Sequence, residues 1–256
     1  MSVHASRIVL KFGSGILTNP RGNNLDRRQF ARLSAEVAAL VRAGHEVLIV
    51  SSGAVAAGMS VLGLAERPRE LAARQACAAV GQSRLMETYS KMFARHGLNV
   101  AQLLLTHGDL DSRTRHDNAR NTLAQLFKSR SVVPVINEND SVAVEELNFG
   151  DNDRLSAEVA LLIGAHRLFL LTSVDGVLDP EGHVVSEVRD IKLAAGLVRP
   201  DKGRLSVGGM TTKLQAAAIA SAGGVRVQIL NGRTPGLVKS ALAGKKVGTV
   251  FRAERA

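Results

Sequence analysis

Two lysines and an aspartate stand where phosphate chemistry would need them. Lys11 lies in an apolar, strand-like run that ends at Gly13, and Lys213 follows Gly209 in the first turn of a predicted helix. A lysine in an apolar strand needs a negative partner, and a lysine in a first helical turn opposes the positive end of the helix dipole. An anionic ligand would relieve both conflicts. Phosphoryl transfer depends mainly on positive charge around the phosphates, and Asp153 could hold the two lysines in position.

Amide and carboxylate side chains form two clusters close together in the sequence. The first, residues 137–140, ends the predicted strand 131–136, and the second, residues 150–153, opens onto the apolar segment 155–163. Ligands of open α/β sheets bind at the carboxyl ends of the strands. Asn and Asp also suit turns and helix caps, so one cluster alone is a weak indication. Two neighbouring clusters indicate a polar pocket.

A carboxylate acceptor would suit this set of residues. It needs no general base, because a carboxyl group with a pKa near 4 is already ionised at neutral pH. Its obstacle is repulsion by the phosphates, about 4 kcal/mol for unit charges 4 Å apart at an effective dielectric near 20. Lysines on the phosphates, together with Mg²⁺, would offset that repulsion.

Glycine turns follow the first two predicted strands. The Gly-Ser-Gly at 13–15 is not a dinucleotide fingerprint, because Thr18 replaces the third glycine, and no Walker A sequence occurs. The residues after it, through Pro20 and Gly22, predict a loop. The remaining interpretation is an anion cradle of backbone N–H groups beside Lys11. Ser-Ser-Gly at 51–53 is a second turn of small residues after a strand, where a ligand could approach the backbone and the start of a helix, although a simple helix cap explains it equally well.

Apolar periodicity predicts alternating strands and helices. The predicted strands are 7–12, 46–50, 99–105, 131–136, 167–171 and 225–230, with 247–251 as an edge strand. The predicted helices are 26–43, 54–62, 68–95 (broken near Gly81), 118–128 and 211–222. This order predicts one doubly wound α/β domain with a mainly parallel sheet and right-handed crossovers.

Composition excludes several other classes of protein. No apolar run is long enough to span a membrane, and the first residues lack the layout of a signal peptide. Cys77 is the only cysteine, so no internal disulfide forms, and the seven histidines lack metal-ligand spacing. We therefore expect a reduced, cytoplasmic protein with no metal-ligand residues of its own. The net charge of +10 fits steering of an anionic substrate, while the 3% aromatic content without Trp argues against nucleic acid.

The chain resembles the glutamate 5-kinases, a branch of the amino acid kinase family, over residues 8–251. The matching stretches are residues 9–14, 52–58, 79–85, 133–140, 150–153 and 209–217. The most specific is Pro-Val-Ile-Asn-Glu-Asn-Asp at 134–140 followed by Gly-Asp-Asn-Asp at 150–153. Relatives that act on N-acetylglutamate, aspartate or UMP look similar at both lysine sites but not at these two clusters.

The resemblance implies a three-layer αβα sandwich that transfers the γ-phosphoryl group of MgATP to the γ-carboxylate of L-glutamate, the first step of proline biosynthesis. It implies phosphate contacts for Lys11 and Lys213 and a catalytic centre organised by Asp153. It assigns glutamate binding to Ser52, Asp140 and Asn152. It implies ATP binding by Lys11, Gly13, Ser14, Thr172, Ser173, Gly208, Gly209, Met210, Thr211, Thr212 and Lys213.

Three departures from the family concern the nucleotide. The family usually has Thr-Asp where this chain has Thr172 and Ser173, often an aromatic residue where Leu178 stands, and usually Thr in place of Val207. The first two differences make the adenine contacts less secure, and the third removes one hydroxyl near the phosphates.

The resemblance also carries expectations about partners and domains. Many members have a C-terminal RNA-binding-like PUA domain, for which this chain leaves no room, so we expect a single amino acid kinase domain over residues 1–256. A homo-oligomer, proline as feedback inhibitor and a glutamyl phosphate reductase as partner are further expectations, with no nucleic acid or membrane involved. Two alternatives stay open: a related kinase acting on N-acetylglutamate, aspartate or UMP, and an amino-acid-binding regulator without activity.

Overall fold

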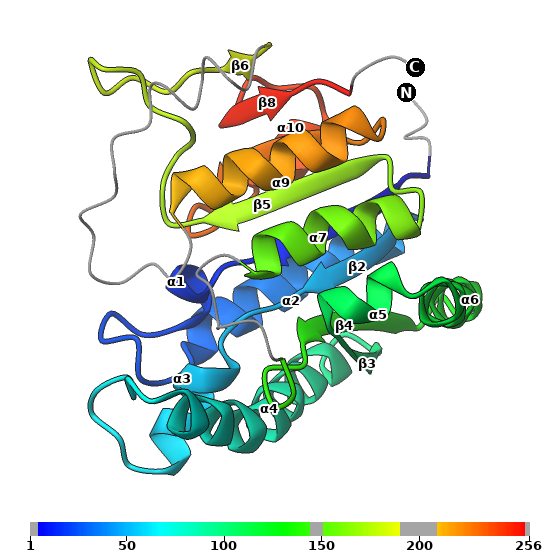
Figure 1. Cartoon of the computed structure of the whole chain (residues 1–256). Coiled ribbons are helices and arrows are strands. Elements are labelled where there is room, and N and C mark those ends of the chain that lie inside the picture. Colours follow the sequence, from blue (N-terminus) through cyan, green and yellow to red (C-terminus); the bar gives the residue numbers. More distant parts are fainter. Residues whose placement is uncertain (1–4, 144–150, 190–208, 254–256) are drawn as a thin grey trace.

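The computed structural model describes residues 5–143, 151–189 and 209–253, and in these ranges an eight-stranded sheet lies between two layers of helices (Figure 1). The strands are β1 (Arg7–Phe12), β2 (Glu46–Val50), β3 (Asn99–Leu105), β4 (Val132–Glu138), β5 (Arg167–Thr172), β6 (Glu187–Val188), β7 (Arg226–Asn231) and β8 (Thr249–Phe251). Their order across the sheet is β3-β4-β2-β1-β5-β7-β8-β6. Neighbouring strands run parallel except β7 and β8.

The described helices are α1 (Ser14–Leu17), α2 (Arg27–Arg42), α3 (Ala54–Val61), α4 (Leu71–Ala94), α5 (His107–Asp111), α6 (Arg113–Lys128), α7 (Asp151–Leu162), α9 (Met210–Ala222) and α10 (Leu237–Leu242). The core on one face of the sheet includes α6, α7 and α9, and that on the other includes α2, α4 and α10. Figure 1 shows α7 and α9 in front of the sheet and α2 behind it. None of these helices combines the length and the apolar character needed to cross a bilayer.

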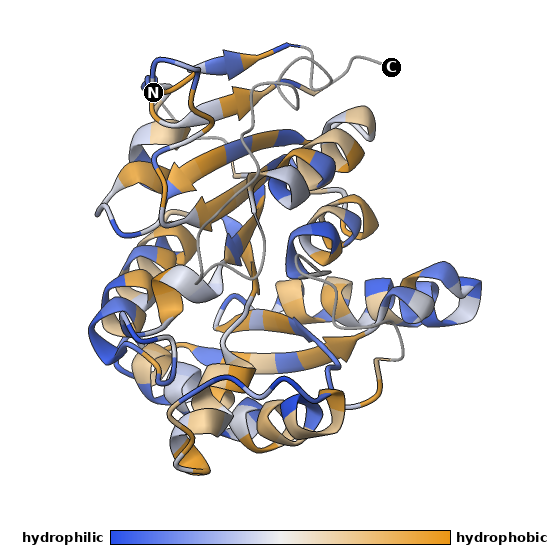
Figure 2. Ribbon diagram, turned by 60° about the vertical axis from the view of Figure 1, so that its left-hand side comes forward, coloured by the Kyte–Doolittle hydropathy of each residue, from blue (hydrophilic) through white to orange (hydrophobic). Residues whose placement is uncertain are grey.

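Helices on both faces explain why the strands read as nearly continuous apolar runs. In β1, Val9 faces one core, while Ile8, Leu10 and Phe12 face the other. A parallel sheet covered on both sides buries alternate residues of each strand in opposite cores. Figure 2 shows the result, with strands mostly in the hydrophobic colours and helices carrying both colours.

Strand β1 lies where the order of the sheet reverses. It pairs with β2 on one side and β5 on the other, so that Lys11 stands opposite Val50 and Leu170. On one side of β1 lie β2, then β4, then β3, and on its other side lie β5 and then β7, which come later in the sequence. Such a reversal leaves a crevice at the carboxyl ends of the strands, where ligands of α/β proteins bind.

The predicted three-layer α/β fold with a mainly parallel sheet is confirmed, but the break predicted near Gly81 was wrong. Helix α4 runs unbroken from Leu71 to Ala94. A Cβ atom at Gly81 would lie 1.8 Å from the carbonyl oxygen of Ala54 on α3. Glycine is needed there because the two helices touch backbone to backbone, and this packing outweighs its poor helix propensity.

Two smaller expectations were also wrong. The last long apolar segment supplies β8, but the edge of the sheet is the two-residue strand β6, which is too short to show a sequence pattern. The residues after Gly13 begin with the helical turn α1 before the predicted loop, because Ile16 and Leu17 are fully buried there and Thr18 bonds back to the carbonyl of Ser14.

Candidate active site

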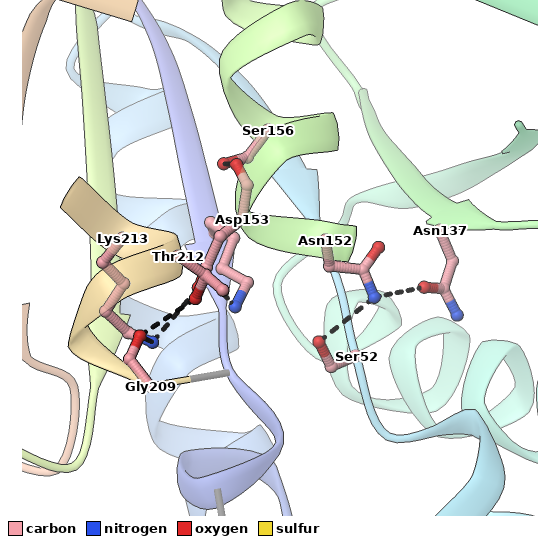
Figure 3. A network of polar contacts seen from close by, with 9 residues as sticks. Ser52, Asn137, Asn152, Asp153, Ser156, Gly209, Thr212 and Lys213 are labelled. Carbon is pink, nitrogen blue, oxygen red and sulfur yellow. Dashed lines mark hydrogen bonds and ion pairs between the residues drawn. The ribbon is translucent and has the colours of Figure 1, made fainter. Parts of the chain in front are cut away.

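Asp153 joins the two lysines that the sequence singled out. Its side chain is fully buried near the start of α7, with Lys11 Nζ 2.5 Å from Oδ1 and Lys213 Nζ 3.1 Å from Oδ2. The three residues come from three elements, β1, α7 and α9, that meet at the carboxyl edge of the sheet. Figure 3 shows Asp153 turned toward Lys213 and Thr212.

The charge state of Asp153 follows from its surroundings. Burial, the largest single influence, raises the pKa of Asp153, but the charges of Lys11 and Lys213 and hydrogen bonds from Lys11 and Thr212 outweigh it and hold that pKa below its ordinary value. Asp153 is therefore ionised at neutral pH. Among the described residues, two ammonium groups face this one carboxylate, and both lysines are only 6% exposed. Two cations so close together suit an anionic ligand.

Helix α9 presents its first turn to the same place. Gly209 precedes the helix and provides no side-chain cap, while the Thr212 hydroxyl donates to Asp153 Oδ2 over 2.8 Å. Lys213 Nζ also lies 3.5 Å from the carbonyl oxygen of Gly209. Met210 and Thr211 form the start of this turn. The N–H groups of a first turn have no partner within the helix, which suits them to a phosphate.

The glycine turn after β1 lies beside the end of β5. Gly13 N–H donates to the carbonyl of Leu171 over 3.1 Å, and a Cβ atom at Gly15 would lie 3.5 Å from Ser173 Oγ. The structure thus places Gly13, Ser14, Thr172 and Ser173 along one stretch of the sheet edge. Gly208, the remaining predicted ATP-binding residue, lies outside the described residues, as does Val207.

Arg233 is a cation at this edge that the sequence reasoning missed. Its guanidinium donates to the carbonyl oxygen of Gly15 over 2.5 Å. The available signal was its place in the segment that follows the apolar part of β7, at a strand's carboxyl end.

Asn152 faces the opposite way from Asp153. Its Nδ2 donates to Ser52 Oγ over 3.3 Å and to Asn137 Oδ1 over 3.1 Å, as Figure 3 shows. Ser52 stands just before α3, whose N-cap Gly53 has φ 103° and no capping side chain. Two consecutive residues of α7 therefore serve two different groups of side chains.

Asp140 lies beyond the end of β4, in the turn where Val142 N–H bonds to the carbonyl of Asn139. It is half-buried, and its carboxylate is close enough to raise the pKa of Arg67, although burial first and then Arg74 act more strongly and lower that pKa overall. The predicted glutamate-binding residues thus lie at the ends of β2, β4 and the start of α7.

Asn137 belongs to the first predicted polar cluster, but neither it nor Gln82 was assigned a role in the site. Asn137 is 1% exposed at the end of β4, and its Nδ2 donates to Gln82 Oε1 over 2.9 Å. A fully buried amide within a β-branched strand was the signal in the sequence, since such a group needs partners.

ATP fits the described residues better than a protein-bound metal does. Across the described ranges no three His, Cys, Asp or Glu side chains gather as metal ligands, and Asp153 is engaged by both lysines. The two lysines and the first turn of α9, whose N-cap Gly209 has no side chain, suit phosphate oxygens. Mg²⁺ would accordingly be held by the phosphates of the nucleotide it accompanies.

The sequence matches the model of the amino acid kinase family over residues 6–231. The chain therefore belongs to the amino acid kinase family. Within it, the chain is 48% identical to the glutamate 5-kinase of Geobacter metallireducens over 252 residues, which cover 96% of this chain and 67% of that protein. It is 46% identical to a glutamate 5-kinase of Thermus thermophilus over 260 residues, covering 98% of this chain and 68% of the relative.

Solved structures agree on the fold. UMP kinase from Bacillus anthracis superposes with a TM-score of 0.63 at 15% identity, covering 98% of this chain and 97% of that one. N-acetylglutamate synthase from Neisseria gonorrhoeae gives a TM-score of 0.62 at 17% identity, covering 97% of this chain and 62% of that one. At these identities the likeness concerns the fold alone.

Proposed function

We propose that this chain transfers the γ-phosphoryl group of ATP to the γ-carboxylate of L-glutamate, giving L-glutamyl 5-phosphate, the first step of proline biosynthesis. The observation that carries the proposal is the start of α7. There Asp153 holds two buried lysines that suit phosphates, while Asn152 faces amide and hydroxyl groups that suit an amino acid. The similarity to glutamate 5-kinases over nearly the whole chain supports glutamate as the acceptor.

On the phosphate side, the two lysines supply the positive charge. Lys11 and Lys213 hold the phosphates and stabilise the negative charge that spreads over the transferring group, with the first turn of α9 adding N–H donors. Asp153 fixes both ammonium groups from a buried position, so that little reorganisation accompanies the reaction. Mg²⁺, when bound with ATP, supplies further positive charge on the transferring phosphoryl group.

On the acceptor side, the amino acid must be held so that its γ-carboxylate reaches the phosphate. Asn152 Oδ1 and the Asp140 carboxylate are acceptors for an α-ammonium group, and the Ser52 hydroxyl and the first N–H groups of α3 are donors for an α-carboxylate. One γ-carboxylate oxygen then attacks the γ-phosphorus, the bond to the β–γ bridging oxygen breaks, and ADP leaves with that electron pair. No base is needed, because the carboxylate is already ionised.

The test is to trap the acyl phosphate with hydroxylamine across a panel of acceptors: L-glutamate, L-aspartate, N-acetyl-L-glutamate and, in a separate ADP-release assay, UMP. We expect hydroxamate with L-glutamate and much less product with the others. Product with another acceptor but none with L-glutamate would overturn the assignment, and no product with any acceptor would favour a binding protein without activity.

Further properties belong to the same proposal. We propose that residues 1–256 form one amino acid kinase domain, supported by a single sheet with strands from Arg7 to Phe251. We also propose a cytoplasmic homo-oligomer whose labile product passes to a glutamyl phosphate reductase, with proline as inhibitor. Exposed apolar side chains at the end of α3, Val61, Leu62 and Leu64, are compatible with contact between copies.

A further inference from the structure

Four polar side chains form one hydrogen-bonded row on the side of the site where the amino acid is proposed to bind. Gln82 Oε1 accepts from Asn137 Nδ2 over 2.9 Å, and Asn137 Oδ1 accepts from Asn152 Nδ2 over 3.1 Å. Asn152 Nδ2 also donates to Ser52 Oγ over 3.3 Å, so both of its hydrogens are used. Figure 3 shows the part of this row that runs from Asn137 through Asn152 to Ser52.

A backbone group fixes the direction of the whole row. Side-chain amides can ordinarily be turned to exchange oxygen and nitrogen, and their neighbours decide the orientation. The N–H of Glu138 donates to Asn137 Oδ1 over 3.0 Å, so this atom must be the oxygen. It follows that Asn137 presents its nitrogen to Gln82 and its oxygen to Asn152. Gln82 must then turn its oxygen, and Asn152 its nitrogen, toward Asn137.

Two members of the row, Gln82 at one end and Asn152 inside it, are left with complementary polar atoms. The remaining atom of Gln82 is the donor Nε2 and the remaining atom of Asn152 is the acceptor Oδ1. Both are buried, and neither has a hydrogen-bond partner among the residues that the structure describes. Buried polar atoms are nearly always paired in native proteins. The two unpaired atoms therefore point to a ligand that offers an acceptor to Gln82 Nε2 and a donor to Asn152 Oδ1.

The packing of α4 brings Gln82 to the acceptor site. Its neighbour Gly81 touches Ala54, the first residue of α3, so closely that a Cβ atom there would lie 1.8 Å from the Ala54 carbonyl oxygen. Ser52 stands two residues before Ala54, at the other end of the row. Gln82 is thus held beside the first turn of α3 by this close contact between α3 and α4.

We propose that Gln82 is a specificity-determining residue of the acceptor site, whose Nε2 donates to the α-carboxylate of the amino acid while its Oε1 anchors Asn137. Asn152 Oδ1, oriented through Asn137, then receives the α-ammonium group. This inference rests on the proposed function, because it assigns the α-carboxylate of the proposed substrate to Gln82, which is not one of the predicted glutamate-binding residues. An α-amino acid offers one acceptor group and one donor group on the same carbon, which matches the unpaired donor of Gln82 and the unpaired acceptor of Asn152.

Replacement of Gln82 by glutamate tests the proposal most sharply. Gln82→Glu keeps the size and an acceptor oxygen for Asn137, but it replaces the donor by a second carboxylate oxygen. We expect the KM for L-glutamate to rise roughly 10- to 100-fold, the scale of a lost hydrogen bond to a charged group, with the KM for ATP and kcat changed less than about threefold. A residue with only a structural role would not separate the two substrates in this way.

Two further measurements keep the test decisive. Gln82→Met, neutral and of similar length, should also raise the KM for L-glutamate but by less. It replaces Gln82→Glu in the test if the charged variant folds poorly. 4-Aminobutyrate, which is glutamate without its α-carboxylate, should be affected far less than L-glutamate by Gln82→Glu, either as acceptor or as competitor. Ser83→Glu puts the same charge on the exposed side of α4 and serves as the control.

The outcomes separate this proposal from the proposed function. Wild-type protein that forms no hydroxamate with L-glutamate would remove the function and this inference with it. Active wild type, with both Gln82 variants within about twofold of its KM for L-glutamate, would remove the role of Gln82 alone. Equal losses with L-glutamate and 4-aminobutyrate would also overturn it, since the α-carboxylate would then not be the group that Gln82 binds.

Discussion

Replacing Asp153 by Asn should destabilise the free protein and nearly abolish turnover. The carboxylate is fully buried, with ammonium groups 2.5 and 3.1 Å away, so each attraction is about 5–7 kcal/mol at an effective dielectric near 20. The cost of taking all three ions from water offsets most of this sum. Removing one member of such a buried set leaves an uncompensated charge, typically at a loss of about 3–5 kcal/mol. Asp153→Asn should therefore lower the free energy of unfolding by about that amount and cut kcat by about 10²–10³.

The structure adds a more specific expectation about rescue by anions. Asp153→Asn removes one negative charge from beside the two lysines, so any phosphate that binds there meets a stronger positive field. Thermal shift should therefore show a larger gain in Tm from inorganic phosphate or MgATP for the variant than for the wild type. Chemical denaturation without ligand supplies the free energy of unfolding, and the hydroxamate assay supplies kcat.

Asp26→Asn is the matched control, because Asp26 caps α2 by accepting from the N–H groups of Arg28 and Gln29, and asparagine caps helices equally well. It makes the same change of charge with no expected change in stability or turnover. An Asp153→Asn protein as stable as the wild type, with kcat within a few-fold, would refute the reasoning that Asp153 balances the buried lysines.

Three further predictions follow from the same geometry. Lys213→Ala should lower kcat by about 10²–10³ in the hydroxamate assay, as expected for losing one preorganised charge, and near-wild-type turnover would remove this lysine from the mechanism. Gly81→Ala should destabilise the protein by about 1–3 kcal/mol in denaturant titrations, because its Cβ would overlap α3. Without that contact the same change would stabilise a helix by up to about 1 kcal/mol, so a gain in stability would contradict the packing. Stability should also fall as the pH drops below about 4, the ordinary range of carboxyl groups. Burial raises the pKa of Asp153 and of Glu158, but in both cases cationic partners and hydrogen bonds outweigh it. Because both pKa values are lower in the folded state, the stability they add is present above that range and is lost as the pH falls through the folded values. Glu158→Gln should flatten this loss in a pH series of unfolding titrations.

The order of strands and helices could be predicted because a parallel sheet covered on both faces leaves a strong pattern in the sequence. The runs at β1, β2 and β3 are apolar enough to define their own ends, and their predicted bounds agree with the structure. The break near Gly81 could not be judged correctly, since periodicity within one helix does not show that a second helix touches it. The edge strand β6 was missed because its two residues are held by pairing with β8.

The candidate site divides in a similar way. Lys11 and Lys213 could be predicted to share a ligand, because each is out of place in its own segment without an anion. Their meeting at Asp153 is visible in the structure, while the chemical roles of all predicted site residues stay predictions. Gln82 escaped notice since a glutamine within a long helix is ordinary. Its significance depends on a partner 55 residues away, at the end of a strand.

Because Asn152 and Asp153 are neighbours in the chain, the site selects the length of the amino acid that accepts the phosphoryl group. Both side chains leave the same turn of α7, so in the proposed function the backbone of this helix helps to set the separation between the head of the amino acid and the phosphates. An acceptor shorter by one methylene group, such as aspartate, would be held by the same head contacts and would stop short by about the length of one carbon–carbon bond, roughly 1.5 Å. A displacement of that order can cost about 10²-fold in rate.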